Sequence, residues 1–186
     1  GSYIITAGHV CENRVPSGMQ PDRINAEFTT HRLDGEGFKA IVLDYNKEHD
    51  VCIMFAPELT EEIQPVLLSN EAPKPGDKVF NISAPKGLFQ ANSAPIIEGR
   101  FNGDYNKSDW YTLPAAPGCS GSMIVNVEGK LIGMVHSVFI DFPFMTLSTD
   151  YNFLKGYIEA NLQRYTTYKN VMELLELENI FAPGAS

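Results

Sequence analysis

The densest strand-like sequence lies between residues 78 and 148, where short apolar segments alternate with turn residues. No helical periodicity separates these segments, so they predict consecutive antiparallel strands and not a parallel sheet. Six such segments in a row are enough to close a small barrel. The predicted strands are Lys78 to Ser83, Ala94 to Phe101, Trp110 to Leu113, Met123 to Val127, Lys130 to Val138 and Phe144 to Ser148.

The first part of the chain carries a similar pattern, ahead of a linker that contains several prolines. Its predicted elements are strands at Ser2 to Thr6, Ile24 to His31, Phe38 to Tyr45 and Val51 to Phe55, with a helical turn at Ala7 to Cys11. We therefore expect an N-terminal half-barrel over 1–56, an interbarrel linker over 57–76, a C-terminal barrel over 77–149, and C-terminal helices with a tail over 150–186.

Two amphipathic stretches close the chain. Asp150 to Leu162 has apolar residues at helical spacing, and so does Tyr168 to Phe181, where the apolar positions are interleaved with glutamates. We expect the first stretch to be a terminal helix on the barrel. For the second stretch two interpretations stay open: a further helix packed on the barrel, or a docking helix for a partner or a neighbouring domain.

The loop from Pro117 to Ser122 places Ser120 between two glycines just before an apolar strand. Gly118 and Gly121 allow a tight turn that would present the serine outward. The same turn can direct the backbone N–H groups of Gly118 and Ser120 at one point, where they would bind an oxyanion. Turns before strands are commonly rich in Gly and Ser, so this loop alone does not establish a nucleophile.

Two upstream residues complete a chemical set with Ser120. His9 follows a β-branched run, and Asp50 directly precedes another apolar run. A serine hydroxyl becomes a good nucleophile when an imidazole takes its proton and a carboxylate orients that imidazole. Asp44 is a rival for the carboxylate, but it precedes a polar segment, so we favour Asp50.

The segments Thr-Ala-Gly-His-Val, Asp-Val-Cys-Ile-Met and Pro-Gly-Cys-Ser-Gly-Ser together resemble the three signatures of trypsin-like serine peptidases. The chain is most similar to their short bacterial and viral branch, which includes HtrA-like enzymes. The resemblance implies an all-β, chymotrypsin-like fold of two antiparallel six-stranded barrels, with no metal or other cofactor. It also implies that His9 is the general base and acid, that Asp50 orients it, and that Ser120 is the nucleophile.

The resemblance also bears on the N-terminus and on the role. Two strands normally precede the histidine strand in this family, so we expect a first barrel truncated at the N-terminus or a fragment that has lost any leader. The expected function is serine endopeptidase, acting on protein or peptide substrates through an acyl-enzyme. Two alternatives stay open: a viral protease that processes its own polyprotein, and a catalytically silent binding module of the same fold.

By the same resemblance, the base of the specificity pocket falls at Pro114, with walls at Leu113, Ser137 and Val138. No acid stands at the base to pair with an Arg or Lys side chain, so we expect a small or medium apolar residue before the scissile bond. His136 is one residue out of step with the substrate-reading histidine of some relatives. Since strand side chains alternate faces, we expect it near Asp50 instead.

Each of the three cysteines, Cys11, Cys52 and Cys119, lies within two residues of a predicted catalytic residue. An odd count near the site suggests thiols in a reducing compartment, and hence a cytoplasmic location in a bacterial or virus-infected cell. We expect them to be small buried apolar side chains. A cysteine nucleophile at Cys119 is disfavoured because Ser120 is the residue flanked by the glycine pattern, and no Cys or His pairing with metal-ligand spacing occurs.

The net charge of −9 argues against a nucleic-acid partner, because phosphate binding needs clustered Lys and Arg, which are absent. No run of 18 apolar residues occurs, so no membrane span is expected. At 44% hydrophobic and 20% charged residues, the chain can bury a normal core.

Overall fold

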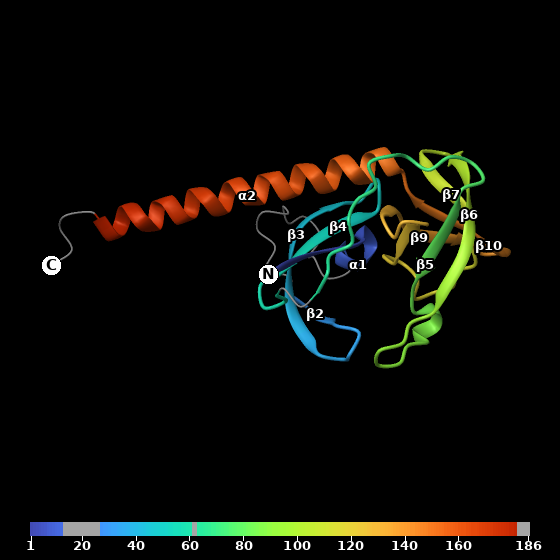
Figure 1. Cartoon of the computed structure of the whole chain (residues 1–186), viewed down its shortest axis with the longest axis horizontal. Coiled ribbons are helices and arrows are strands. Elements are labelled where there is room, and N and C mark those ends of the chain that lie inside the picture. Colours follow the sequence, from blue (N-terminus) through green and yellow to red (C-terminus); the bar gives the residue numbers. More distant parts are fainter. Residues whose placement is uncertain (13–26, 61–62, 182–186) are drawn as a thin grey trace.

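The computed structural model describes residues 1–12, 27–60 and 63–181. The first part forms an open four-stranded antiparallel sheet in the order β1-β4-β3-β2 (Figure 1). Its elements are β1 (Ser2–Ala7), α1 (Gly8–Glu12), β2 (Glu27–His31), β3 (Gly37–Asn46) and β4 (Val51–Ala56). The part of the predicted second strand that precedes Glu27 lies outside the described residues.

The second part is a closed six-stranded barrel in the order β10-β7-β6-β5-β8-β9. Alternate side chains point into it, as at Asp109 and Tyr111 of β7, which are both buried. This arrangement confirms the predicted all-β, chymotrypsin-like fold. The elements are β5 (Lys78–Ile82), the 3₁₀ turn η2 (Pro85–Gly87), β6 (Ile96–Tyr105), β7 (Ser108–Thr112), β8 (Met123–Asn126), β9 (Leu131–Phe139) and β10 (Phe142–Thr149).

One continuous helix, α2 (Tyr151–Phe181), replaces the two separate helices expected at the C-terminal end. Asp150 caps it, because its Oδ1 accepts the backbone N–H of Phe153 at 2.8 Å. Figure 1 shows α2 passing along the four-stranded sheet and ending beyond it, so the expectation that the second stretch packs on the barrel is wrong. Over the described residues, no helix combines the length and apolarity needed to cross a membrane.

The helix stays continuous because no Gly or Pro interrupts the segment between the two predicted stretches. Thr166 and Thr167 lie in that segment, and their hydroxyls donate to backbone carbonyls four residues earlier. Tyr165 fixes the middle of the helix to the first sheet, since its hydroxyl donates to the carbonyl of Leu43 on β3 at 2.9 Å.

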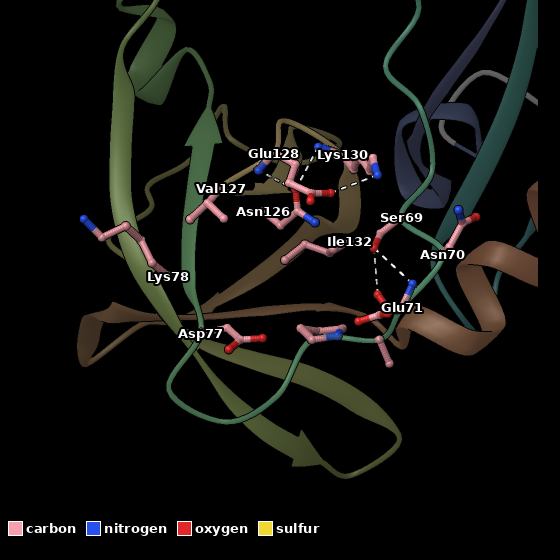
Figure 2. Close-up of a pocket in the computed structure, with 12 residues that line it drawn as sticks. Ser69, Asn70, Glu71, Asp77, Lys78, Asn126, Val127, Glu128, Lys130 and Ile132 are labelled. Carbon is pink, nitrogen blue, oxygen red and sulfur yellow. Dashed lines mark hydrogen bonds and ion pairs between the residues drawn. The ribbon is translucent and has the colours of Figure 1, made fainter.

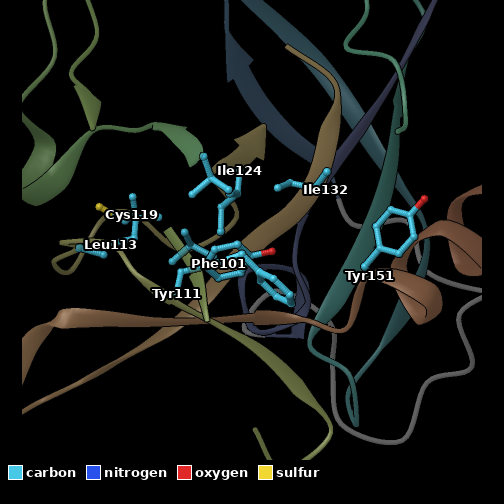
Figure 3. Packing of buried hydrophobic residues seen from close by; sticks show 10 residues of the cluster. Phe101, Tyr111, Leu113, Cys119, Ile124, Ile132 and Tyr151 are labelled. Atoms are coloured by element: carbon cyan, nitrogen blue, oxygen red, sulfur yellow. The ribbon is translucent and has the colours of Figure 1, made fainter. Parts of the chain in front are cut away.

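A small apolar cluster joins the two sheets. Val51 at the start of β4 packs with Met134 of β9 and with Leu154 and Ile158 of α2, and all four are buried. The barrel has its own core, in which Phe101 and Tyr111 pack at 5.2 Å between ring centroids (Figure 3). The junction cluster therefore sets how the first sheet lies against the barrel, immediately beside residue 50.

Asp109 is a buried carboxyl at the junction of the barrel with α2. It is 2% exposed, and its Oδ2 accepts the backbone N–H of Tyr151 at 2.9 Å. Burial raises the pKa of Asp109 to about 7, and the negative charges of Asp150 and Asp104 add to the effect. The folded protein therefore holds a proton on Asp109 at pH values where the unfolded chain has released it.

We predict that the titration of Asp109 lowers the free energy of unfolding as pH rises. Because the folded pKa lies above the ordinary value of 3.8, its favourable contribution is complete below about pH 4 and is lost by about pH 7. In Asp109→Asn the amide oxygen can still accept the Tyr151 N–H, but the titration is gone. Urea unfolding from pH 4 to 8 should show the wild type losing stability relative to Asp109→Asn across this range.

The matched control is Asp141→Asn, at an exposed residue of the β9–β10 turn. It should follow the wild-type pH dependence. Parallel curves for the wild type and Asp109→Asn would contradict the prediction.

Candidate active site

His9 and Asp50 lie face to face at the edge of the first sheet. The Nδ1 atom of His9 is 2.8 Å from Asp50 Oδ2 and 3.1 Å from Oδ1, and the backbone N–H of His9 donates to Oδ1 at 2.7 Å. One carboxylate thus holds both the ring and the backbone of the histidine. An ionised carboxylate only accepts, so Nδ1 carries the proton and Nε2 is left as an acceptor.

Strand pairing brings these two residues together. Ala7 at the end of β1 pairs with Val51 at the start of β4, so the residues just beyond each strand meet. Gly8 permits the approach, since a Cβ there would lie 2.9 Å from the backbone nitrogen of Val51. Asp50 itself adopts a left-handed conformation with φ of 50°, which is uncommon outside glycine and concentrates at functional positions.

The loop that carries Ser120 is a tight turn built on two left-handed glycines, Gly118 (φ 100°) and Gly121 (φ 83°). A hydrogen bond from Ser122 N to the carbonyl of Cys119 (2.9 Å) closes the turn, and one from Gly121 N to the carbonyl of Val135 (2.7 Å) joins it to β9. The N–H groups of Gly118 and Ser120 donate to no acceptor in the described part of the chain. Two free donors in one turn are what an oxyanion site requires.

Gly121 brings this loop against the strand that leads to His9. A Cβ on Gly121 would overlap Thr6 Oγ1 and lie 3.0 Å from the backbone nitrogen of Ala7. The serine loop therefore packs on the end of β1, two residues before His9. Among the described residues, neither Ser120 Oγ nor His9 Nε2 has a hydrogen-bond partner. A general base and its nucleophile are often farther apart before substrate binds than in the reacting complex.

The two carboxylates weighed from the sequence lie in different places. Asp50 contacts His9, whereas Asp44 lies beside Tyr157 of α2. Burial raises the pKa of Tyr157, and the neighbouring Asp44 carboxylate raises it further. Asp44 thus belongs to the surface where α2 meets the first sheet.

His136 lies on β9, where the register with β10 shifts between Val135 and Ser137. Its ring nitrogens are within hydrogen-bond distance of Ser137 Oγ (3.0 Å) and Ser108 Oγ (3.3 Å). Burial lowers the pKa of His136, the charge of Asp50 opposes this, and His9 adds to it. The ring is therefore within electrostatic reach of the pair but bonded to two serines, and among described residues it has no hydrogen bond to Asp50.

The expectation of three thiols is wrong, because Cys11 and Cys52 form a disulfide. Each stands two residues beyond a member of the His9–Asp50 pair. Closing a loop with a separation of 41 residues contributes about 4 kcal/mol in the chain-entropy picture. Cys119 is free and buried, as expected. The predicted cytoplasmic location was based on three reduced thiols, and the disulfide removes that basis.

The residues predicted to form the specificity pocket differ in exposure. Leu113 is fully buried in the barrel core, its N–H donating to the carbonyl of Phe144 at 2.8 Å. Pro114 is exposed, and Ser137 and Val138 are half-buried at the end of β9. The pocket stays a prediction.

Two polar features lie elsewhere. A cavity of about 460 Å³ is bordered by Ser69, Glu71, Asp77, Lys78 and Lys130 (Figure 2), and no predicted catalytic residue lines it. The carboxylates of Asp104, Asp109 and Asp150 approach within 4.8 Å of one another. Asp109 and Asp150 accept backbone N–H groups at the start of α2, which accounts for their position without an ion.

Sequence reasoning missed two residues that shape the site. Thr149 fixes the turn before β4, because its hydroxyl donates to the carbonyl of His49 at 2.9 Å. Gly8 allows the close approach described above. The role of Gly8 could have been predicted from its place directly before His9. The contact of Thr149 could not, because it joins residues that are 100 positions apart in the sequence.

Comparison with known proteins gives a family and a fold. The family model of the trypsin-like peptidase domain matches residues 1–134. None of the curated proteins compared with the sequence matches it. An inactive form of Rv3671c from M. tuberculosis, mutated from serine to alanine, superposes with a TM-score of 0.65 at 18% identity, covering 86% of this chain and 77% of that one.

Two further solved structures share the fold of this chain. A serine endoprotease from Yersinia pestis gives a TM-score of 0.67 at 16% identity, with 87% of this chain and 54% of that chain covered. The active form of the Rv3671c protease from M. tuberculosis gives a TM-score of 0.64 at 22% identity, with 83% of this chain and 66% of that chain covered. The chain thus spans only about half of the Yersinia protein.

We predict that Gly121→Ala destabilises the protein more than Gly129→Ala. Both glycines have positive φ, so both substitutions carry the same backbone cost of about 1–2 kcal/mol. At Gly121 the new methyl group would also collide with Thr6, whereas nothing lies within 4 Å of it at Gly129. Urea unfolding should show an additional loss of about 1–3 kcal/mol for Gly121→Ala. Equal losses would mean that the serine loop does not rest on β1.

Proposed function

Because the chain belongs to the family of trypsin-like peptidase domains, we propose that it is a serine endopeptidase that uses His9, Asp50 and Ser120 as its catalytic triad. The observation that carries the proposal is the contact of 2.8 Å between His9 and Asp50, beside a serine loop that packs against the strand leading to His9. This pairing of a base, its orienting acid and an adjacent serine is the constellation that activates a hydroxyl nucleophile.

In the proposed reaction, Ser120 Oγ attacks the carbonyl carbon of the scissile bond while His9 Nε2 takes the hydroxyl proton. The carbonyl oxygen becomes an oxyanion that accepts hydrogen bonds from the N–H groups of Gly118 and Ser120. Each such donor contributes about 3 kcal/mol of transition-state stabilisation. His9 then gives its proton to the leaving amine, the C–N bond breaks, and an ester to Ser120 remains.

Hydrolysis of that ester repeats the sequence with water as the nucleophile. His9 accepts a proton from water, the hydroxide oxygen adds to the ester carbon, and the proton passes to Ser120 Oγ as the ester bond breaks. Throughout, Asp50 stays ionised, holds Nδ1 as the donor and stabilises the imidazolium. The double contact of Asp50 with the ring and the backbone of His9 suits that role.

For the residue before the scissile bond we propose a small or medium apolar side chain. Pro114, at the predicted base of the pocket, offers no carboxylate to a basic side chain. Ser137 and Val138 at the end of β9 would border the pocket. Protein or peptide is the substrate, and the competing function is a catalytically silent module of the same fold.

We predict that Ser120→Ala abolishes both peptide hydrolysis and labelling by a fluorophosphonate probe, without loss of folding. The hydroxyl is the nucleophile, while the turn depends on its glycines. The matched control is Ser122→Ala, because Ser122 Oγ is already engaged by Asn81 Nδ2 at 2.8 Å. That variant should stay labelled. A wild type that resists the probe would favour the silent module, and labelling that survives in Ser120→Ala would exclude Ser120.

We predict that Asp50→Asn lowers kcat by about four orders of magnitude, because an amide in place of the carboxylate favours the wrong imidazole tautomer. Asp44→Asn is the control, since Asp44 lies against α2, and it should change kcat by less than about threefold. Steady-state kinetics on a peptide substrate measures both. The reverse order of effects would show that Asp44 is the orienting acid.

A further inference from the structure

The loop between β5 and β6, residues 83–95, lies directly against the serine loop. The N–H of Lys86 donates to the carbonyl of Pro117 at 2.7 Å. A Cβ on Gly118 would lie 2.8 Å from the carbonyl oxygen of Ala84. The loop therefore borders Gly118, one of the two proposed oxyanion donors.

This loop exposes large apolar side chains. Leu88 is 65% exposed and Phe89 is 45% exposed. Together with Gln90, Ser93, Ala94 and Pro95 they border an open hollow of about 380 Å³, enough for one large side chain. No acidic residue occurs between 83 and 95, although the chain as a whole carries a net charge of −9.

The loop is also tied to the other half of the molecule. The N–H of Asn92 donates to the carbonyl of Leu33 at 2.7 Å, which ties the β5–β6 loop to the β2–β3 turn. Leu33 is 46% exposed. We refer to Leu88 and Phe89, which border the hollow, as the apolar platform. Exposed apolar groups gathered beside a reaction site mark a surface that a ligand covers.

The strand order tells which part of a substrate would reach the platform. β8 begins at Met123, just after the serine loop, and lies between β5 and β9 in the barrel. Ile82, the last residue of β5, and Met134 of β9 both pair with Met123 from opposite sides. The proposed pocket residues Ser137 and Val138 continue β9, so the acyl part of the substrate lies on that side. The leaving-group part then lies on the β5 side, where the platform is.

We propose that the apolar platform binds an apolar side chain of the substrate on the leaving-group side of the scissile bond. The inference rests on the proposed peptidase function. An extended peptide advances about 3.3 Å per residue, so the first three residues after the scissile bond lie within about 10 Å of the oxyanion donors. The preferred substrates are therefore polypeptides with Leu, Ile or Phe at one of these three positions, in addition to the residue before the scissile bond.

The test uses internally quenched peptides that are identical before the scissile bond and carry Leu or Ser at the first, second or third position after it. For the wild type, kcat/KM should be at least about tenfold higher with Leu than with Ser at one of these positions. In the double variant Leu88→Ser, Phe89→Ser that ratio should fall below about threefold. The control is Val127→Ser, which removes a residue that is 69% exposed at the β8–β9 turn and should keep the wild-type ratio.

The same variants are treated with the fluorophosphonate probe, which reports the nucleophile without the leaving-group peptide. Unchanged labelling with a reduced ratio supports the platform. A wild-type ratio near one, or a ratio unaffected by the double variant, overturns the platform while leaving the peptidase proposal intact. A wild type that does not label contradicts the peptidase function instead. In that case binding of the Leu and Ser peptides, measured by fluorescence anisotropy, tests the platform alone: equal affinities overturn it.

Discussion

The candidate site depends on the apolar junction between the two sheets. Val51, Met134, Leu154 and Ile158 are completely or almost completely buried there, and burying side chains of this size contributes about 1.5–3 kcal/mol each. Val51 is the residue next to Asp50, so the packing that joins the halves also fixes where the carboxylate lies. The serine loop then meets β1 through the contact between Gly121 and Thr6. The site is thus assembled from two sheets whose relative position is decided outside it.

Within the first sheet, the His9–Asp50 pair is held by more than its own hydrogen bonds. Register pairs the ends of β1 and β4, Gly8 allows their turns to approach, and the Cys11–Cys52 disulfide closes the same corner. The sheet is open at β1. These local contacts therefore hold the strand ends in place, as closure of the barrel does in the second half. Asp50 holds its left-handed conformation at this constrained corner.

Most of the fold was predictable because alternation of apolar residues and turn chemistry are local signals, as in β5 to β10. The disulfide was not predictable, because Cys11 and Cys52 become neighbours only after β1 pairs with β4. The continuity of α2 was missed because residues 163–167, between its two amphipathic stretches, are mostly polar and interrupt the apolar spacing. The catalytic candidates were found from motif spacing, but the contact between Asp44 and α2, which separates it from Asp50, depends on tertiary packing.

The β5–β6 loop lies between the proposed oxyanion donors and the proposed apolar platform. Its backbone supports the serine loop through Lys86, its side chains present Leu88 and Phe89, and its far end is tied to the first sheet through Asn92. Gly118 cannot carry a side chain without displacing the carbonyl of Ala84, so the backbones of the two loops are in close contact. A substrate chain that covers the proposed apolar platform would therefore contact the loop whose backbone supports Gly118. In such an arrangement, binding energy gained beyond the scissile bond can be used at the reacting carbonyl, where it raises kcat and not only affinity.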